Sequence, residues 1–524
     1  MRTRSSFRLG LPALALLLTV SFLLQGSTLP DLPDKSLGTI NADELRMHIE
    51  FLASPELGGR YTLSPQLAVV NRYLASRLRA YGFKGAVEGS FLQEYDVRRS
   101  LPKPQDSLLT LTSNQGTEHS FRYGEFVLDG PSVDFQGEVV FVGYGISAPE
   151  QGHDDYADLD LQGKVAFALS GGPAGMDDVP DAGEKSVMAS RAGAAGFLSM
   201  PPERFLRVMR RPTFKRFILS RDQVSLVESP SVNRPSAVIL TPDSAAPLLT
   251  AAGLVLDIAY DPPPKFDMTP RSLGIRAEAQ VAMDEEIFKV ANVAGILEGS
   301  DPGLKDQHIV ISAHQDHLET RDDGTIFPGA DDDASGVAAV LEIAQSFAAF
   351  PPRRSILVMF HSGEEEGLLG SRYNTDVAPA VPLESIVANL NMDMIGRSKG
   401  EDASGPGNSL LTGPNGVYVI GADRISRQLH DINISTNQDF EKLDFDYTLN
   451  DPSHPSRLYY RSDHWNYGKH EVPFIFFFSG IHEDYHRPSD TVDKIDFAKT
   501  TAVARHIFAL AWRLATMEER VKAD

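Results

Sequence analysis

The second half of the chain alternates short apolar runs with a helix-like segment, and this alternation restricts the fold more than any other feature. Runs of strand length, rich in Val, Ile, Leu and Phe, are HIVISA, RSILVMF, SIVANLNMDMI and VPFIFFF. The segment VAAVLEIAQSFAAF has apolar residues three and four positions apart, which predicts an amphipathic helix. Alternating strands and helices predict an α/β domain with a mainly parallel central sheet flanked by helices. Functional side chains of such a sheet lie at the carboxyl ends of its strands.

Acidic residues and histidines adjoin these runs at five successive places. They are His314 with Asp316, Asp331–Asp333, Glu364–Glu366, Asp393, and His482 with His486. Each place alone has an ordinary structural explanation: a hydrogen-bonded pair at a strand end, a helix cap, an acidic helix N-terminus, or pairing of Asp393 with Arg397. A shared metal site would explain all five with one cause.

Composition restricts what such a site can contain. The chain has no cysteine, so any metal must be held by His, Asp and Glu. Three carboxylates and two neutral histidines around two Zn²⁺ ions leave one excess positive charge, which a bridging hydroxide would neutralise. Asp and Glu number 71 against 49 Lys and Arg, and the formal net charge of −22 disfavours nucleic acid as a partner.

The motifs resemble those of the di-zinc exopeptidase family that includes bacterial leucine aminopeptidases, plasma glutamate carboxypeptidase and glutamate carboxypeptidase II. AHQDHL, GADDDASG, EEEGLLGS, NMDMIGR and HEDYHRPSDT occur in the family's order. The resemblance covers residues 41 to about 123 and 290 to the end of the chain. It implies a zinc exopeptidase fold that binds two Zn²⁺ ions per chain and acts on peptides.

The resemblance also implies which residues hold the two zinc ions. His314 and Asp393 would be the terminal ligands of one zinc ion. Glu365 and His486 would be the terminal ligands of the other. Asp331 would bridge the two metals and precede a cis peptide bond to Asp332. The full implied ligand set is His314, Asp331, Glu365, Asp393 and His486.

Three further residues receive catalytic roles from the resemblance. Glu364 would be the general base that takes a proton from water and passes it to the leaving amine. Asp316 would lie next to the ligand His314 without binding the metal itself. His464 would stabilise the oxyanion of the tetrahedral intermediate, with a structural histidine beside Trp465 as the alternative.

Four segments are expected along the chain. Residues 1–27 read as a signal peptide, 36–123 as the N-terminal part of the peptidase domain, and 271–524 as the zinc peptidase catalytic domain. Between them, residues 124–270 contain short β-rich runs such as GEVVFVGYGI and SAVILT. This stretch resembles the protease-associated insert domain of relatives. A loop with two glycines, ELGGRYTLSP, interrupts the helix-like periodicity of the first segment.

The N-terminal segment predicts export to the periplasm or the extracellular space. Arg2, Arg4 and Arg8 precede an apolar run from Leu9 to Leu24, which is short for a membrane span. Contact with a membrane is expected only if this segment stays uncleaved. The oligomeric state is not predicted.

The function expected from these features is that of a secreted di-zinc aminopeptidase. The alternatives within the same fold are a carboxypeptidase or dipeptidase, and a glutaminyl cyclase-like enzyme with one zinc. A non-catalytic, receptor-like binding protein is the alternative outside enzymology. Carboxylate-rich sites also accept Mn or Co.

Overall fold

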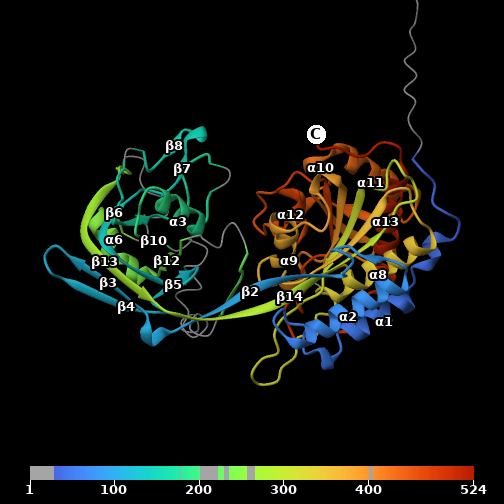
Figure 1. Cartoon of the computed structure of the whole chain (residues 1–524), viewed down its shortest axis with the longest axis horizontal. Helices are drawn as coiled ribbons and strands as arrows, with labels where there is room; N and C mark the ends of the chain where they lie inside the picture. Colours follow the sequence, from blue (N-terminus) through green and yellow to red (C-terminus); the bar gives the residue numbers. More distant parts are fainter. Residues whose placement is uncertain are drawn as a thin grey trace, which may run out of the picture.

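The computed structural model describes residues 29–157, 159–176, 179–200, 222–228, 235–255, 266–400 and 405–524. The expected signal peptide lies outside these residues. They form two lobes, joined by two long strands that run from one lobe to the other (Figure 1). Among the described residues, no helix has both the length and the apolar composition needed to cross a bilayer.

The larger lobe is built on a sheet to which ten described strands contribute. Its order is β11-β2-β14-β16-β15-β17-β20-β18-β19, with β1 added on β14. The strands are β1 (Lys84–Gly85), β2 (Leu92–Pro102), β11 (Gln223–Leu226), β14 (Met283–Leu297), β15 (His308–His314), β16 (Ser355–His361), β17 (Ile386–Met392), β18 (Gly416–Ile420), β19 (Asp444–Asp446) and β20 (Phe474–Phe478).

The centre of this sheet is parallel, as expected, whereas its flanks are mixed. β15 pairs in parallel with β16 and β17, and β17 pairs in parallel with β20. β14 runs antiparallel to β16, and β18 runs antiparallel to β20. Every residue of the four central strands is buried. This agrees with their continuous apolar sequences, because parallel strands are covered on both faces.

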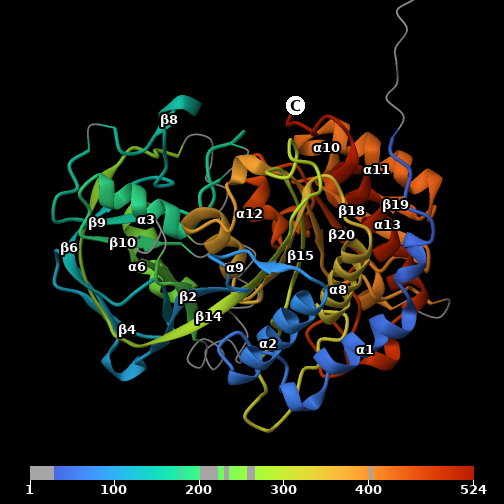
Figure 2. The ribbon, with the colours of Figure 1, turned by 45° about the vertical axis from the view of Figure 1, so that its right-hand side comes forward.

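Helices cover both faces of the sheet (Figure 2). The helices of this lobe are α1 (Ala42–Leu52), α2 (Pro65–Ala80), α8 (Ala334–Ala349), α9 (Leu369–Arg372), α10 (Ala422–Ile425), α11 (Arg427–Asp439), α12 (His464–Gly468) and α13 (Phe497–Thr516). One face packs against helices that share a single apolar core with the sheet, chiefly α1, α2, α8, α11 and α13, and the other face packs against short helices after β16 and before β20. The α/β architecture predicted from the sequence is confirmed.

The smaller lobe has its own sheet and its own apolar core. The strand order is β4-β3-β13-β6-β9-β10-β12-β5. Its elements are β3 (Leu108–Ser113), β4 (Glu118–Arg122), β5 (Phe126–Asp129), β6 (Val133–Phe141), β9 (Val165–Ala168), α3 (Ala182–Arg191), β10 (Gly196–Ser199), β12 (Ala237–Leu240), α6 (Pro242–Ala252) and β13 (Arg271–Val281), with a small hairpin of β7 (Ser147–Ala148) and β8 (His153–Asp154).

The boundaries expected at residues 124 and 270 fall inside this smaller lobe. β3 and β4 precede residue 124 and β13 follows residue 270, yet all three belong to its sheet. The lobes are joined instead by β2 and β14, which pair from Met283 opposite Pro102 to Val293 opposite Leu92. The sequence of a short strand that alternates polar and apolar residues does not show which sheet the strand joins. The boundaries expected from the sequence at residues 124 and 270 therefore differ from the lobe boundaries in the structure.

Candidate metal centre

The carboxyl ends of the four central strands bring the sequence-predicted acids and histidines together. β15 ends at His314, and Glu364 follows the end of β16 by three residues. Asp393 comes directly after β17, and the loop that carries His486 follows β20. Because these strands are parallel, all four ends lie at one edge of the sheet. Side chains up to about 170 positions apart in the sequence can therefore meet there.

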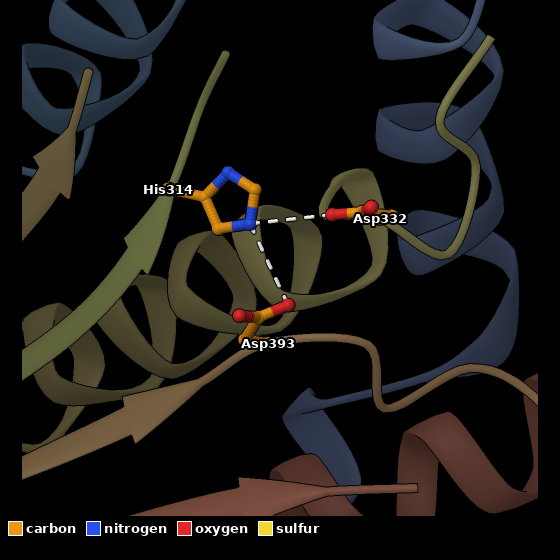
Figure 3. Close-up of side chains that lie close together, drawn as sticks. All are labelled: His314, Asp332 and Asp393. Atoms are coloured by element: carbon orange, nitrogen blue, oxygen red, sulfur yellow. Dashed lines mark ion pairs between the residues drawn. The ribbon is translucent and has the colours of Figure 1, made fainter. Parts of the chain in front are cut away.

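The first group of possible metal ligands consists of His314, Asp332 and Asp393 (Figure 3). The Nε2 atom of His314 lies 3.3 Å from Oδ1 of Asp332 and 3.5 Å from Oδ1 of Asp393. All three residues are buried, and this Nε2 atom has no hydrogen-bond partner among the described residues. A buried imidazole nitrogen that faces two carboxylates without a hydrogen bond fits a divalent cation.

The tautomer of His314 also suits a ligand. Its Nδ1 atom lies 3.2 Å from the backbone oxygen of Asp316. A carbonyl oxygen only accepts, so Nδ1 carries a proton, and in the neutral ring the lone pair of Nε2 faces the two carboxylates. The carboxylate of Asp316 accepts hydrogen bonds from Thr62 Oγ1 at 2.7 Å and from the backbone nitrogen of Glu364 at 3.3 Å. Asp316 thus links β15 to the Glu364 loop.

A second group lies beside the first and shares Asp332 with it. It consists of His317, Asp332 and Glu365. His317 Nδ1 lies 2.7 Å from Oε1 of Glu365. His486 approaches the same carboxylates, with its Nε2 atom 3.1 Å from Oε2 of Glu365 and 3.2 Å from Oδ2 of Asp332. His317 was expected from the sequence to be a supporting residue without a ligand assignment, although its place three residues after His314 in AHQDHL was a usable signal.

Asp332, rather than Asp331, occupies the position between the two groups, which corrects the sequence-based assignment by one residue. Oδ1 of Asp332 faces His314 and its Oδ2 faces His486. Asp331 belongs to neither group: its Oδ1 accepts a hydrogen bond from the backbone nitrogen of Gly396 at 2.6 Å, and its Oδ2 lies 3.2 Å from Nε2 of His482. The cis peptide bond joins Asp332 and Asp333, not Asp331 and Asp332.

The three consecutive aspartates have three different surroundings, which explains the error. Asp333 caps α8, since its Oδ1 accepts a hydrogen bond from the backbone nitrogen of Gly336 at 2.9 Å. Asp490 holds the segment from the other side: its Oδ2 accepts hydrogen bonds from the backbone nitrogens of Asp331 and Asp332 at 3.0 and 3.2 Å. These contacts leave only the side chain of Asp332 facing both groups.

Glu364 stands beside the first group without belonging to it. Its Oε2 atom lies 3.9 Å from Nε2 of His314, and its side chain keeps 13% of its surface exposed. Burial raises the pKa of this carboxyl above its ordinary value, and the charges of Asp393 and Glu365 add to the increase. A carboxylate with some access to solvent, next to the ligands but not among them, can accept a proton from a water molecule at the centre.

His464 lies in an apolar environment, contrary to the role expected from the sequence. Its Nε2 donates a hydrogen bond to the backbone oxygen of Tyr459 at 2.9 Å. Its ring stacks on Phe476, with 4.5 Å between the centroids, and burial lowers its pKa to about 3. It belongs to neither metal group. The structural alternative therefore describes His464 better, because a ring packed and hydrogen-bonded in this way cannot also face a substrate.

The substitution His464→Phe tests this assignment. The rate constants for peptide hydrolysis are expected to change by less than about two-fold, while the free energy of unfolding falls by about 1–3 kcal/mol, because the carbonyl of Tyr459 loses its buried donor. Steady-state kinetics and thermal unfolding measure the two effects. A loss of kcat without a loss of stability would restore the oxyanion role.

Two histidines of the centre, His314 and His486, hold protons when metal is absent. Burial alone would lower the pKa of His486, but its contacts with Asp332 and Glu365 raise it to about 10. Burial likewise opposes the proton on His314, and the charges of Asp393 and Glu364 raise its pKa well above the ordinary value. A metal ion binds only the neutral imidazole and must displace these protons.

Zinc binding is therefore expected to release protons at about pH 7.5 and to tighten as the pH rises towards about 9. At a pH below its raised pKa, each of these histidines keeps a proton that competes with the metal. The affinity for zinc therefore increases with pH. Titration calorimetry in buffers of different ionisation enthalpy counts the protons released. Binding without proton release, or with an affinity independent of pH, would contradict these pKa shifts.

Two overlapping groups of histidines and carboxylates at the carboxyl edge of a parallel sheet define an α/β domain with a candidate centre for two divalent metal ions. Residues 292–511, which carry most of this α/β domain, match the model described as Peptidase family M28. The resemblance to di-zinc exopeptidases predicted from the sequence is thereby confirmed.

Individual relatives are more distant. The uncharacterized protein YfbL of Escherichia coli (strain K12) is 28% identical over 220 residues, which are 39% of this chain and 66% of that protein. A probable leucine aminopeptidase of Arthroderma otae is 28% identical over 256 residues, 46% of this chain and 63% of that protein. The chain thus spans slightly less than two thirds of the length of either relative.

A solved structure resembles the chain over nearly its whole length. It is an aminopeptidase from Aneurinibacillus sp. strain AM-1, with a TM-score of 0.54 and 19% sequence identity over 94% of this chain and 98% of that one. At this identity the likeness is one of fold. It extends beyond the M28 domain, because that domain alone covers less than half of the chain.

Proposed function

We propose that the chain is a zinc-dependent exopeptidase, and specifically an aminopeptidase, with two Zn²⁺ ions per chain. The observation that carries this proposal is the shared carboxylate of Asp332, which contacts His314 of the first group and His317 of the second, while Glu364 belongs to neither group. The match of the α/β domain to peptidase family M28 supports the reaction class. A relative named as a leucine aminopeptidase and the aminopeptidase title of the similar structure support the preference for N-termini.

The donor set fits zinc, since imidazole nitrogens and carboxylate oxygens are its usual ligands when cysteine is absent. His314 and Asp393 would hold one ion, Glu365 and His486 the other, and Asp332 both. His317 would orient Glu365 through the contact at 2.7 Å. When bound, the two ions would lower the pKa of a water molecule and polarise the scissile carbonyl.

Glu364 supplies the proton transfers in this proposal. Its carboxylate accepts the proton that the attacking water loses and later donates it to the nitrogen of the leaving group. The hydrogen bond from its backbone nitrogen to Asp316 holds the loop in place while the side chain stays accessible. Carboxylates around the centre also favour a substrate with a free, positively charged amine.

The direct test compares leucyl-4-nitroanilide, its N-acetylated form and an N-blocked dipeptide with a free carboxyl group, and then adds a free dipeptide and a peptide with N-terminal glutamine. Of the first three substrates, the proposal expects hydrolysis of leucyl-4-nitroanilide alone. Hydrolysis of only the blocked dipeptide would indicate a carboxypeptidase, and cleavage restricted to free dipeptides would indicate a dipeptidase. Turnover of none of these, with cyclisation of N-terminal glutamine, would indicate the cyclase-like alternative, and no reaction at all would indicate a binding protein.

We also propose that the smaller lobe is a protease-associated insert that limits substrate length. A cavity of about 580 Å³ lies between Glu365 to Gly367 on one side and Val127 to Pro131 of the smaller lobe on the other. Arg98 and Arg372 also line it and could bind a carboxylate of a short peptide. The presence of two arginines in the lining is the observation that favours a dipeptidase as the second candidate.

The substitution Val127→Trp tests the role of the smaller lobe. Filling the cavity is expected to raise KM for a tetrapeptide by about 10-fold or more relative to a dipeptide, because overfilling costs about 1–3 kcal/mol. Leu108→Trp, on an exposed position of the same lobe, is the matched control and should leave the ratio unchanged. An unchanged ratio in Val127→Trp would contradict the proposed role.

Export completes the proposal, with residues 1–27 as a cleaved signal peptide. Their basic start and short apolar run support it. N-terminal sequencing of the protein from an extracytoplasmic fraction should begin near residue 28. A chain that starts at Met1 and sediments with membranes would indicate an uncleaved anchor instead.

A further inference from the structure

Arg60, in the glycine-containing loop before α2, is a fully buried cation outside the groups of possible metal ligands. Its residue surface is 1% exposed. A guanidinium has five N–H donors, and this one makes five hydrogen bonds, all to backbone carbonyls. The acceptors are the oxygens of Gln315 (3.1 Å), Leu52 (2.7 Å), Pro328 (2.6 Å), Gly329 (3.0 Å) and Asp332 (3.3 Å).

Four of these five carbonyls belong to the two loops that carry ligands. Gln315 lies between His314 and His317, and the segment from Pro328 leads to Asp332. The backbone of Arg60 adds a further contact, since its oxygen accepts a hydrogen bond from the nitrogen of His317 at 3.2 Å. One side chain therefore ties together two ligand loops that are otherwise separated along the chain.

The backbone of this loop is shaped around the contact. Gly58, Gly59 and Arg60 all have positive φ angles, at 55°, 87° and 64°. A Cβ atom on Gly59 would lie 2.4 Å from the backbone oxygen of Leu318, so only glycine allows this close approach. The left-handed conformation is unfavourable for arginine and persists where surrounding contacts over-determine it.

The charge of Arg60 faces the acidic centre without forming a direct ion pair with a described residue. Burial lowers the pKa of the guanidinium, and the carboxylates of Asp332, Asp316, Asp333 and Asp490 oppose that decrease. A fixed positive charge behind the carboxylates offsets their mutual repulsion. It does so without occupying the carboxylate oxygens that face the metal groups.

We infer that Arg60 is a positioning residue of the metal centre, which sets the spacing of the loops around His314 and Asp332 so that one carboxylate can serve two ions. This inference rests on the proposed two-metal function. It assigns a purpose to the ELGGRYTLSP loop, which no ligand or catalytic role explains.

The chain offers a matched control in Arg354, which is also completely buried. Its guanidinium donates to the side-chain oxygen of Gln307 and to the backbone oxygens of Leu514, Met517 and Glu518. It lies at the amino end of β16, at the opposite edge of the sheet from the metal centre. Substituting Arg354 should cost stability for the same physical reason as substituting Arg60, but without affecting the ligand loops.

The experiment compares zinc affinity in the full-length variants Arg60→Met and Arg354→Met by competition with a chromophoric chelator. Arg60→Met is expected to bind zinc about 10–100-fold more weakly, as outer-shell substitutions do. Arg354→Met should keep the wild-type affinity while losing comparable thermal stability. Wild-type zinc affinity at both positions in Arg60→Met would overturn the inference.

Two further variants keep the test decisive if Arg60→Met does not fold. Arg60→Lys retains the charge with fewer donors and should restore part of the zinc affinity, whereas Gly59→Ala should weaken it by displacing the loop. Wild-type affinity in both would overturn the inference. Zinc binding by the wild type without hydrolysis of any peptide would overturn the proposed activity alone and leave the role of Arg60 intact.

Discussion

Asp332→Asn is expected to weaken zinc binding at both positions by more than about 100-fold, because outer-shell changes alone cost 10–100-fold. Asp331→Asn should weaken it by about 10-fold or less. Asp332 faces both metal groups, whereas Asp331 is tied to Gly396 and His482. The two variants carry the same isosteric change at adjacent positions, so each is a control for the other. Equilibrium dialysis with metal analysis measures the zinc bound per chain by each variant.

Aminopeptidase activity should follow the same pattern. Asp332→Asn is expected to be inactive at zinc concentrations that saturate the wild type, since loss of the shared ligand affects both positions. Asp331→Asn should regain most of its activity when zinc is added. If Asp331→Asn were the variant that lost both metals, the placement of Asp332 between the groups would be wrong.

Glu364→Gln is expected to lower kcat by about 10²–10⁴-fold, the usual contribution of general acid–base catalysis. This corresponds to about 3–5 kcal/mol in the activation barrier. The amide keeps the shape of the side chain but cannot accept the proton, and Glu364 belongs to neither metal group. Zinc content should therefore stay at the wild-type value, which separates this variant from a ligand substitution.

Glu483→Gln is the matched control for Glu364→Gln. Glu483 is exposed and lies in the loop that carries His486, so the same chemical change there should leave kcat within about two-fold, as for most surface substitutions. Normal turnover by Glu364→Gln with full zinc content would exclude it as the base. Loss of zinc in that variant would instead make Glu364 a ligand.

The fold of the larger lobe could be predicted because its signals are strong and local. Continuous apolar runs indicated the buried central strands, and the position of acids and histidines after these runs indicated the edge at which they meet. The smaller lobe was predicted less well. Its strands β3 and β13 are half-exposed and pair with partners far away in the sequence, so nothing local marked where the lobe begins and ends.

For the metal centre, the sequence predicted which motifs come together, but not which aspartate of GADDDASG faces the centre. The motifs identified His314, Glu365 and Asp393 as close neighbours, and the structure brings them to one edge of the sheet. Which of three consecutive aspartates faces the centre depends on backbone hydrogen bonds from residues such as Gly396, more than 60 positions away. The sequence carries no record of those contacts.

Arg60 and His464 show why single polar residues were harder to judge. Arg60 acts on carbonyl groups, which every residue possesses, so no partner side chain marked its importance in the sequence. The family resemblance implied that His464 stabilises the oxyanion, yet its ring packs against Phe476. The roles of Arg60 and His464 both depend on the direction in which the side chain points. That direction follows from packing rather than from the spacing of motifs.

The most direct test of the central claim is a zinc titration of the metal-free protein with the hydrolysis of leucyl-4-nitroanilide measured at each addition. The account predicts two zinc ions bound per chain, no activity before zinc is added, and a return of activity as the centre fills. Saturation at a single zinc, or activity that persists in the metal-free protein, would contradict a two-metal centre organised around Asp332.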